Sequence, residues 1–492
     1  MKFILAIDQG TSGTKTLIFD EQGKVCTKVT EPLKTFYLEA GYVEQYPEEI
    51  YQNVLACVKA CIDIFKINGG DINSIVTCGI SNQRETFIVW DKEGKPLYNA
   101  VVWQCKRSID ICERLKKQNL QQTVKTKTGL LIDPYFSGSK LIWLYENNEQ
   151  VRSAIDRGDA YFGTIDTWLL YKLTNGKNYT TDYTNASRTL FFNLSTLSWD
   201  KELLNIFGLS KLNLPECKPS SYLFGETNFN GILDQPLTIS AMIGDSHAAA
   251  FGEGCYETGV AKATMGTGCS ILMNIGDEIK YSDNGMVTTI CWSTEDEVQY
   301  ALEGVIVTCG ATIEWLKNEL GLFADSKQTD AMATAVEDNN GVYLIPAFSG
   351  LGAPHWDMNR KASLTGLTFG TNKNHIVRAA LESIPYQIKD VIEAMEADTK
   401  IQLRQLMIDG GISSNQFIVQ FLTNLLEKPV VNIGIPDVSA LGAAYLAGLQ
   451  QKIYKDLEHL SQLNRDKRIL QPIDDGKVKV WYKGWKEAIR NE

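Results

Sequence analysis

The stretch Ile7-Asp8-Gln9-Gly10-Thr11-Ser12-Gly13-Thr14-Lys15 decides the fold, and it directly follows the apolar run Phe3-Ile4-Leu5-Ala6. The pattern predicts a buried strand that ends in an acid and then turns through two glycines. Such a turn presents backbone N–H groups, hydroxyls and one cation to a phosphate chain. We expect Asp8 to hold a hydrated Mg²⁺ beside the phosphates. A strand followed by a plain polar hairpin gives a similar sequence, so this segment alone leaves that alternative open.

Other phosphate-binding motifs do not fit the spacing. A Walker loop has four residues between its first glycine and a Gly-Lys pair, whereas here Gly10 and Gly13 are followed by Thr14-Lys15. The sequence also lacks the His-Arg-Asp and Asp-Phe-Gly motifs of protein kinases. The segment is therefore a different, acid-led phosphate loop.

Size and composition describe a folded protein with more than one domain. The chain has 492 residues, which is too long for one compact core, and 44% of them are hydrophobic and 22% charged. Two large domains with a ligand cleft between them are expected. The formal charge of −11 argues against partners that need a positive field, so no nucleic-acid or membrane-surface role is predicted.

Several features predict a cytoplasmic protein without a structural metal. No apolar run approaches the roughly 20 residues that cross a bilayer, and the run before Asp8 is too short for a signal peptide, so no membrane insertion is expected. The eleven cysteines form no Cys-x-x-Cys pair, which is typical of reduced thiols. Four scattered histidines offer no zinc ligand set.

The order of strand-like and helix-like segments is that of an α/β protein with an internal duplication. A helical segment from Glu48 to Ile67 precedes a buried strand from Ile75 to Ile80. The second half opens with its own hydroxyl-glycine turn, Thr264-Met265-Gly266-Thr267-Gly268-Cys269-Ser270, which suggests a repeat of the first turn. Near the end, the residues Ser439 to Gly448 are small and apolar and predict a helix packed tightly on a sheet.

One carboxylate stands where a general base is needed. Phosphoryl transfer to an alcohol requires an acid residue that is separate from the metal and takes the hydroxyl proton. Asp245 lies between an apolar strand and a small-residue helix in Ala241-Met242-Ile243-Gly244-Asp245-Ser246. An acid at this position also caps a helix, and the two roles are compatible.

A second polar segment predicts the wall of an acceptor pocket. Six polar residues, Ser81 to Thr86, lie between two apolar strands, where Arg84 and Glu85 could grip hydroxyl groups. Trp103 and Tyr135 offer aromatic faces for the C–H side of a polyol, although buried aromatic residues are also common in a plain core.

These residues closely resemble the FGGY carbohydrate kinase family of the actin-like ATPase fold, and within it the members that phosphorylate glycerol. The resemblance covers nearly all of residues 1 to 450. The motifs that carry it are Asp8-Gln9-Gly10-Thr11, Asn82-Gln83-Arg84-Glu85-Thr86, Trp103-Gln104-Cys105, Asp133-Pro134-Tyr135-Phe136-Ser137-Gly138, Asp182-Tyr183-Thr184-Asn185-Ala186-Ser187-Arg188-Thr189, Gly266-Thr267-Gly268-Cys269, Gly350-Leu351-Gly352-Ala353-Pro354 and Asp409-Gly410-Gly411.

The resemblance implies an α/β fold of two actin-like, ribonuclease H-like ATPase domains with a catalytic cleft between them. Residues 1–252 would form an N-terminal domain with the polyol acceptor site and the phosphate loop, and residues 253–492 a C-terminal domain that binds the nucleotide. The implied activity is ATP-dependent phosphorylation of a primary hydroxyl of glycerol, with ATP and Mg²⁺ as cofactors. Relatives commonly form dimers or tetramers, so a homo-oligomer is expected.

Carried over residue by residue, the resemblance assigns four sets of positions. The catalytic base would be Asp245. The acceptor would be bound by Arg84, Glu85, Trp103, Tyr135, Asp245, Ser246 and Ser270. The nucleotide would be bound by Thr11, Ser12, Thr14, Lys15, Gly266, Thr267, Gly310, Glu314, Gly411 and Asn415, and Mg²⁺ by Asp8 and Asp245. Lys15 stands where the family carries Arg, which keeps the charge but loses the bidentate fork, and Glu314 replaces a Gln.

Two departures fall in the acceptor pocket. Ser246 stands where the family has Gln, and Ser270 where it has an aromatic residue. Two short hydroxyls in these places make the pocket larger and more polar, so a longer polyol or a ketose, such as a tetritol or pentitol, is an alternative acceptor. An actin-like ATPase without a metabolic acceptor is the alternative from another class.

A third departure concerns control. Members that bind fructose 1,6-bisphosphate use a glycine-rich loop with an Arg, whereas the corresponding stretch here, Asn230 to Pro236, has no cation and includes Asp234. An anionic bisphosphate would be repelled there, so inhibition by this route is expected to be absent.

Overall fold

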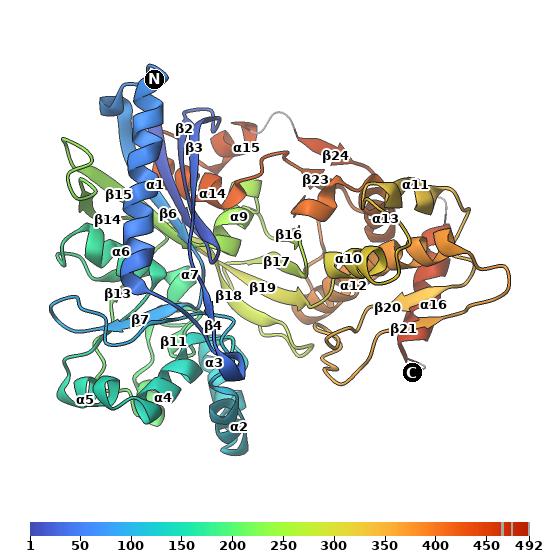
Figure 1. Ribbon diagram of the computed structural model, residues 1–492, viewed down its shortest axis with the longest axis horizontal. Helices are drawn as coiled ribbons and strands as arrows, with labels where there is room; N and C mark the ends of the chain where they lie inside the picture. Colours follow the sequence, from blue (N-terminus) through green and yellow to red (C-terminus); the bar gives the residue numbers. More distant parts are fainter. Residues whose placement is uncertain (464–466, 474–475, 491–492) are drawn as a thin grey trace.

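In the computed structural model, which describes residues 1–463, 467–473 and 476–490, two α/β lobes lie side by side (Figure 1). The first lobe is built on a six-stranded sheet in the order β14-β15-β6-β1-β2-β3. Its strands are β1 (Phe3–Gln9), β2 (Gly13–Asp20), β3 (Val25–Pro32), β6 (Ile75–Asn82), β14 (Ser221–Thr227) and β15 (Leu237–Gly244). Helices α1 (Pro47–Ile67) and α6 (Ile165–Leu173) accompany this sheet.

The predicted strand and turn at the N-terminus form as a hairpin of β1 and β2. Its turn closes through a hydrogen bond from the N–H of Gly10 to the carbonyl oxygen of Gly13, at 2.9 Å. The register places Asp8 opposite Lys15 on β2 and beside Ser81 on parallel strand β6. Since neighbouring strands carry these three residues at one level, the ends of the strands gather an acid, a cation and a hydroxyl at the edge of the cleft.

The second lobe repeats the central strand pairing of the first, which agrees with the predicted duplication. Its seven-stranded sheet has the order β18-β19-β17-β16-β22-β23-β24. The strands are β16 (Val260–Met265), β17 (Cys269–Gly276), β18 (Val287–Ser293), β19 (Val298–Ile306), β22 (Gln405–Asp409), β23 (Val430–Asn432) and β24 (Arg468–Leu470). As in the first lobe, the first strand pairs antiparallel with the second and parallel with a later one, so Thr264 lies opposite Ser270 and beside Asp409.

The two halves of the chain interleave at the junction of the lobes. Helix α9 (Asp245–Glu253) follows β15, and helix α14 (Val438–Gln450), from the end of the chain, packs against α9 and β6. Glycines allow this contact, because a Cβ on Gly442 would lie 1.8 Å from the carbonyl oxygen of Ala248. The division at residue 252 stays a prediction, and α14 belongs in space to the first lobe's sheet.

A smaller sheet of the first lobe carries the predicted acceptor residues. Its order is β4-β5-β8-β7-β9, with β4 (Phe36–Tyr37), β5 (Val43–Gln45), β7 (Phe87–Trp90), β8 (Ala100–Val101) and β9 (Tyr161–Thr164). Helices α2 (Ile109–Lys117), α3 (Gln121–Thr128), α4 (Ser137–Asn147) and α5 (Glu149–Arg157) accompany it. Trp103 and Tyr135 lie on the loops that follow β8 and precede α4.

The helices of the second lobe include α10 (Gly310–Asn318), α11 (Gln328–Thr334), α12 (Lys373–Thr399), α13 (Gln416–Leu426) and α16 (Lys477–Arg490). No helix within the described ranges has the length and apolar character needed to cross a membrane. All eleven cysteines are free thiols, and most are buried like small apolar residues.

Candidate active site

A cavity of about 480 Å³ lies between the lobes and is lined by all seven residues predicted to bind the acceptor. From the first lobe come Arg84, Glu85, Trp103, Tyr135, Asp245 and Ser246, and from the second Ser270. Thr11, Gly266 and Glu303 also line it. The sheet order explains the gathering, because the ends of β1, β6 and β15 meet at one edge of the first sheet and face β16, β17 and β19 of the second.

Asp245 is the first residue of α9 and remains open to this cavity. The N-cap residue is Gly244, so no side chain caps the start of this helix. Oδ1 of Asp245 instead accepts the N–H of Ser246 at 2.6 Å. Its side chain is 39% exposed, and Nε of Arg84 lies 3.3 Å from Oδ1. Withdrawal from bulk solvent raises the pKa of Asp245, and the Arg84 guanidinium opposes this. The carboxylate is thus placed for contact with a ligand as well as for the helix start.

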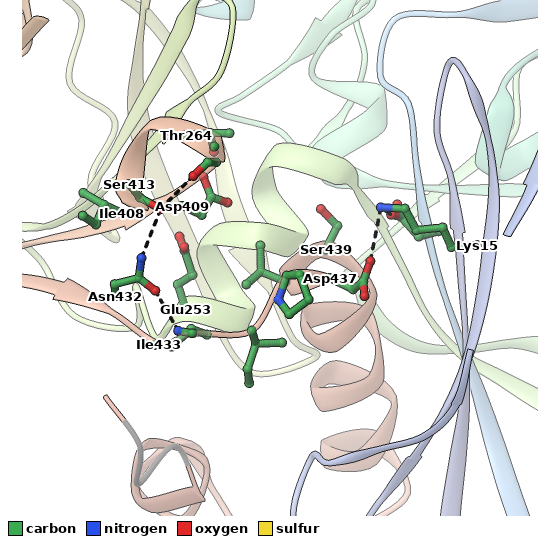
Figure 2. Close-up of a pocket in the computed structure, with 17 residues that line it drawn as sticks. Lys15, Glu253, Thr264, Ile408, Asp409, Ser413, Asn432, Ile433, Asp437 and Ser439 are labelled. Carbon is green, nitrogen blue, oxygen red and sulfur yellow. Dashed lines mark hydrogen bonds and ion pairs between the residues drawn. The ribbon is translucent and has the colours of Figure 1, made fainter. Parts of the chain in front are cut away.

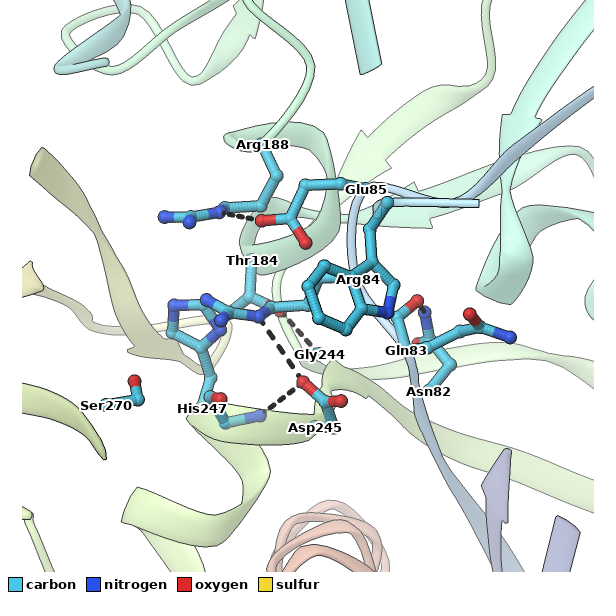
Figure 3. Close-up of polar contacts among 12 residues, drawn as sticks. Asn82, Gln83, Arg84, Glu85, Thr184, Arg188, Gly244, Asp245, His247 and Ser270 are labelled. Atoms are coloured by element: carbon cyan, nitrogen blue, oxygen red, sulfur yellow. Dashed lines mark hydrogen bonds and ion pairs between the residues drawn. The ribbon is translucent and has the colours of Figure 1, made fainter. Parts of the chain in front are cut away.

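A chain of alternating charges fixes Arg84 and Glu85. Arg84 donates to both oxygens of Glu303, at 2.8 and 3.2 Å, and Arg188 Nη1 lies 2.8 Å from the same carboxylate. Nε of Arg188 in turn donates to Oε1 of Glu85 at 2.6 Å (Figure 3). All four side chains are at most 5% exposed. Because each buried charge has an opposite partner, the network is a rigid floor for the cavity.

Two members of this network, Arg188 and Glu303, were not among the predicted site residues. Arg188 lies in a motif that carried the family resemblance, and Glu303 is a lone acid within the apolar strand β19. An acidic residue within an otherwise apolar strand is a signal in the sequence of a buried ion pair, since a buried carboxylate needs a cation. Burial by itself would raise the pKa of Glu303, but Arg188 and Arg84 outweigh it and hold that pKa well below its usual range.

An aromatic pair forms the opposite wall of the cavity. The rings of Trp103 and Tyr135 meet edge to face with centroids 5.6 Å apart. Nε1 of Trp103 donates to Oγ1 of Thr11 at 2.9 Å. Thr11 was predicted at the nucleotide, and this bond ties the turn after β1 to the acceptor wall.

A second cavity, of about 560 Å³, shares Thr264 with the first and is lined by the predicted metal ligand Asp8. Figure 2 shows Lys15 and Asp437 at one end of this cavity. Lys15 Nζ lies 3.6 Å from Asp8 and 3.3 Å from Asp437. Asp437, at the entrance to α14, also pairs with Lys28 at 2.7 Å and was not predicted as a site residue. Burial raises the pKa of Asp8, and the Lys15 ammonium opposes this.

The carboxylate oxygens of Asp8 are suitable ligands for a magnesium ion that arrives with a nucleotide. Oδ1 of Asp8 accepts the hydroxyl of Ser81 at 3.1 Å, and the nearby charge of Asp8 raises the pKa of Asp245. The part of the chain that the structure describes holds no group of three or more His, Cys, Asp or Glu residues suited to a metal. One or two carboxylates completed by phosphate oxygens and water are what Mg²⁺ prefers.

A third cavity, of about 450 Å³, contains four of the predicted nucleotide residues, Gly310, Glu314, Gly411 and Asn415. The N–H of Gly310 donates to the carbonyl oxygen of Gly266 at 2.9 Å. A Cβ on Gly310 would lie 2.7 Å from this oxygen, so only glycine fits here. A Cβ on Gly411 would meet nothing within 4 Å, so this residue leaves open space for a ligand. Asn415 caps α13 and donates to Thr329 at 3.1 Å.

Three other predicted nucleotide residues lie outside these cavities. Ser12 and Thr267 are exposed in their turns. Thr14 is fully buried in β2, and its hydroxyl has no partner among the described residues. Because neighbouring residues of a strand point to opposite faces, the side chain of Thr14 points away from the cavity that Lys15 lines. The structure therefore does not bring the Thr14 side chain to the nucleotide site, contrary to the sequence-based assignment.

Two α/β lobes that share a cleft form the two-domain fold expected from the sequence, and comparison with known proteins identifies the class. Residues 3–252 match the N-terminal domain of the FGGY family of carbohydrate kinases, and residues 261–450 match its C-terminal domain. The chain belongs to the FGGY family of carbohydrate kinases. It is a phosphotransferase that uses ATP, with Mg²⁺ as the accompanying ion.

Individual relatives are similar over almost the whole chain. The glycerol kinase of Thermoanaerobacter pseudethanolicus is 46% identical over 490 residues, covering 99% of this chain and 98% of that protein. The glycerol kinase of Bacillus subtilis is 44% identical with the same coverage. A crystal structure of Plasmodium falciparum glycerol kinase with ADP matches with a TM-score of 0.95 at 36% identity, covering 100% of this chain and 98% of that one. A xylulose kinase from Lactobacillus acidophilus, at 23% identity and a TM-score of 0.89, shares the fold.

Proposed function

We propose that the protein transfers the γ-phosphoryl group of ATP to a primary hydroxyl of glycerol, giving glycerol 3-phosphate and ADP. The observation that carries this proposal is the continuity of the three cavities. We call the first cavity the acceptor cavity, the second, which contains Asp8, the central cavity, and the third the nucleotide cavity. Gly411 lines both the nucleotide cavity and the central cavity, and Thr264 lines both the central cavity and the acceptor cavity. The similarity to proteins named glycerol kinase supports the choice of acceptor.

The roles follow from what each group can do. Arg84, Glu85 and Tyr135 hold the acceptor hydroxyls, and Trp103 covers the carbon chain. The acceptor oxygen attacks the γ-phosphorus while Asp245 takes its proton, and the bond from that phosphorus to the β,γ-bridging oxygen breaks with the electron pair leaving on ADP. Lys15 and the backbone N–H groups of the glycine turns stabilise the phosphate charge. Mg²⁺ held by Asp8 would neutralise further phosphate charge, which leaves Asp245 free to act as the base.

The proposal is tested by replacing the base with its uncharged isostere. Asp245→Asn should lower kcat with glycerol by about 10²- to 10⁴-fold, because no carboxylate is left to accept the proton. Titration calorimetry with MgATP should give an affinity close to that of the parent protein. Asp234→Asn, the same change at an exposed residue far from the cavity lining, is the matched control and should retain full turnover. An unchanged kcat in Asp245→Asn would place the base elsewhere.

A longer polyol or a ketose is the second candidate acceptor, and the two short side chains of the cavity favour it. Ser246 and Ser270 both line the acceptor cavity, and the hydroxyl of Ser270 lies 3.4 Å from an oxygen of Glu303. Turnover of glycerol, erythritol, ribitol and dihydroxyacetone should be compared side by side. A clear preference for glycerol would remove the alternative, whereas Ser270→Phe should selectively lower kcat/KM for the longer polyols if they are the acceptors.

We further propose a homo-oligomer, either a dimer or a tetramer, located in the cytoplasm, where ATP is abundant and free thiols persist. Light scattering coupled to size exclusion would measure the oligomeric state. The absence of inhibition by fructose 1,6-bisphosphate stays a prediction. The assembled acceptor residues argue against an actin-like ATPase that lacks a small-molecule acceptor.

A further inference from the structure

A fully buried lysine lies beneath the aromatic wall of the acceptor cavity. Lys140 of α4 has no exposed surface, although lysine is rarely buried without a charged partner. None of the ion pairs found within the described residues involves Lys140. Its ammonium group is therefore in direct contact only with hydrogen-bond acceptors, which makes these partners informative.

The three N–H groups of this ammonium are directed at the two loops that carry the aromatic wall. Nζ of Lys140 donates to the carbonyl oxygens of Tyr135 at 2.6 Å, Pro134 at 2.8 Å and Trp103 at 3.4 Å. A lysine has three donors and no acceptor, so three carbonyl oxygens satisfy it completely. Trp103 and Tyr135 belong to loops more than 30 residues apart in the chain, and Lys140 joins them from behind while their rings face the cavity.

We propose that Lys140 is a positioning residue for the acceptor, whose ammonium group sets the separation of the Trp103 and Tyr135 rings and thereby the affinity for the polyol. This inference rests on the proposed function, because the two rings bind the acceptor in that scheme. Most of the predicted nucleotide residues lie on other loops, and only Thr11 contacts Trp103, so the effect should fall mainly on the KM for the acceptor and change the KM for ATP little. Such a split separates positioning from a general role in folding.

Titration of Lys140 gives the proposal a pH signature. Burial lowers the pKa of Lys140 to about 8, and the facing groups Glu85, Cys105, Cys112 and Asp133 offset only part of that effect. Above this pH the neutral amine keeps two N–H donors and turns a lone pair toward the third carbonyl oxygen. One bond between the loops is then lost, so the acceptor KM should rise as the pH increases through 8.

The experiment measures steady-state kinetics of the parent protein, Lys140→Met and Lys117→Met. Methionine fills a similar volume without donors, and Lys117 is an exposed lysine of α2 that provides the matched control. At pH 7, Lys140→Met should raise the glycerol KM by about tenfold, as expected for loss of a charged hydrogen bond, while kcat and the KM for ATP change less than about threefold. Between pH 7 and 9.5 the glycerol KM should rise in the parent and in Lys117→Met but not in Lys140→Met.

Two results would overturn the inference. One is a glycerol KM in Lys140→Met equal to that of the parent at pH 7, and the other is a rise above pH 8 that persists in this variant. If Lys140→Met does not fold, the parent alone decides, because a glycerol KM that stays flat from pH 7 to 9.5 excludes the role. Parent turnover of glycerol tests the proposed function separately, and if another polyol of the panel is the acceptor, the same profiles are recorded with that polyol.

Discussion

At the scale of single residues, Glu303 holds the acceptor side of the cleft together. It is buried, it lies on the second lobe, and it pairs with Arg84 and Arg188 of the first. Its two partners are also bound to Asp245 and Glu85, so one carboxylate orients both the base and a hydroxyl ligand. The ion pair of Arg84 with Glu303 joins residues 219 positions apart, which no local sequence pattern reveals.

Removing this charge should cost stability in a pH-dependent way. Glu303→Gln leaves two buried guanidinium groups without their carboxylate, and the free energy of unfolding should fall by about 3 kcal/mol at pH 7. The pKa of Glu303 is lowered in the folded protein, so its stabilisation is fully present above the ordinary glutamate pKa and is lost as the pH falls through the lower folded value. The difference between parent and variant should therefore be constant above about pH 5 and shrink below about pH 4.

Urea denaturation at pH 7, 5 and 3 measures this difference. Glu297→Gln, in the exposed turn before β19, is the matched control and should stay within about 0.5 kcal/mol of the parent. A difference between the parent and Glu303→Gln that is equally large at every pH would contradict the ion-pair explanation.

At the scale of elements, the contact of α14 with α9 decides how the lobes join. The small residues from Ser439 to Gly448 predicted a helix packed tightly on a sheet, and the structure confirms the helix as Val438–Gln450. A Cβ on Gly252 would lie 2.5 Å from the carbonyl oxygen of Val438, so both helices depend on glycine at the crossing. What the pattern did not reveal is the partner, because a small-residue face fits any close surface and α14 returns to the first lobe.

A single methyl group at this crossing should separate the two helices. In Gly442→Ala the new Cβ would lie 1.8 Å from the backbone oxygen of Ala248, and neither helix backbone can yield easily. We expect a loss of about 3 kcal/mol or more, measured as a lower urea midpoint. Gly370→Ala is the control, because its Cβ would meet only side-chain atoms at 3.6 Å. Equal midpoints for the two variants would show that the crossing tolerates an extra atom.

At the scale of the whole molecule, the acceptor cavity takes its walls from both lobes, so the lobes should close when both substrates are bound. Asp245 and Ser246 face Ser270 and Glu303 across this cavity, and the nucleotide cavity lies on the second lobe. Closure excludes water and limits ATP hydrolysis in the absence of an acceptor. Small-angle scattering of Asp245→Asn should show a smaller radius of gyration with MgATP and glycerol together than with either alone. An unchanged scattering profile would argue for a cleft that is already closed.

Much of the fold and part of the site could be predicted before the structure. The acid-led turn after β1 and the motifs around Arg84 and Trp103 identified the acceptor cavity because these residues belong to short, continuous segments. Thr14 was predicted to bind the nucleotide together with its neighbours in the loop. Side chains alternate along β2, so the Thr14 side chain is buried on the face opposite to the cavity that Lys15 lines. Asp437 and Glu303 were missed, since their importance comes from partners, Lys15 and Arg84, that lie in distant parts of the chain.

The sequence by itself determined the α/β class, the duplicated strand-and-turn unit, the identity of the proposed base and the family. These depend on periodicity, glycine turns and motifs, which are properties of neighbouring residues. The tertiary structure alone decided that α14 packs on the first lobe, that Lys140 supports both aromatic rings and that five charges alternate from Asp245 to Glu85. Such contacts join distant segments, and only the packing of sheets and lobes brings their atoms within bonding distance.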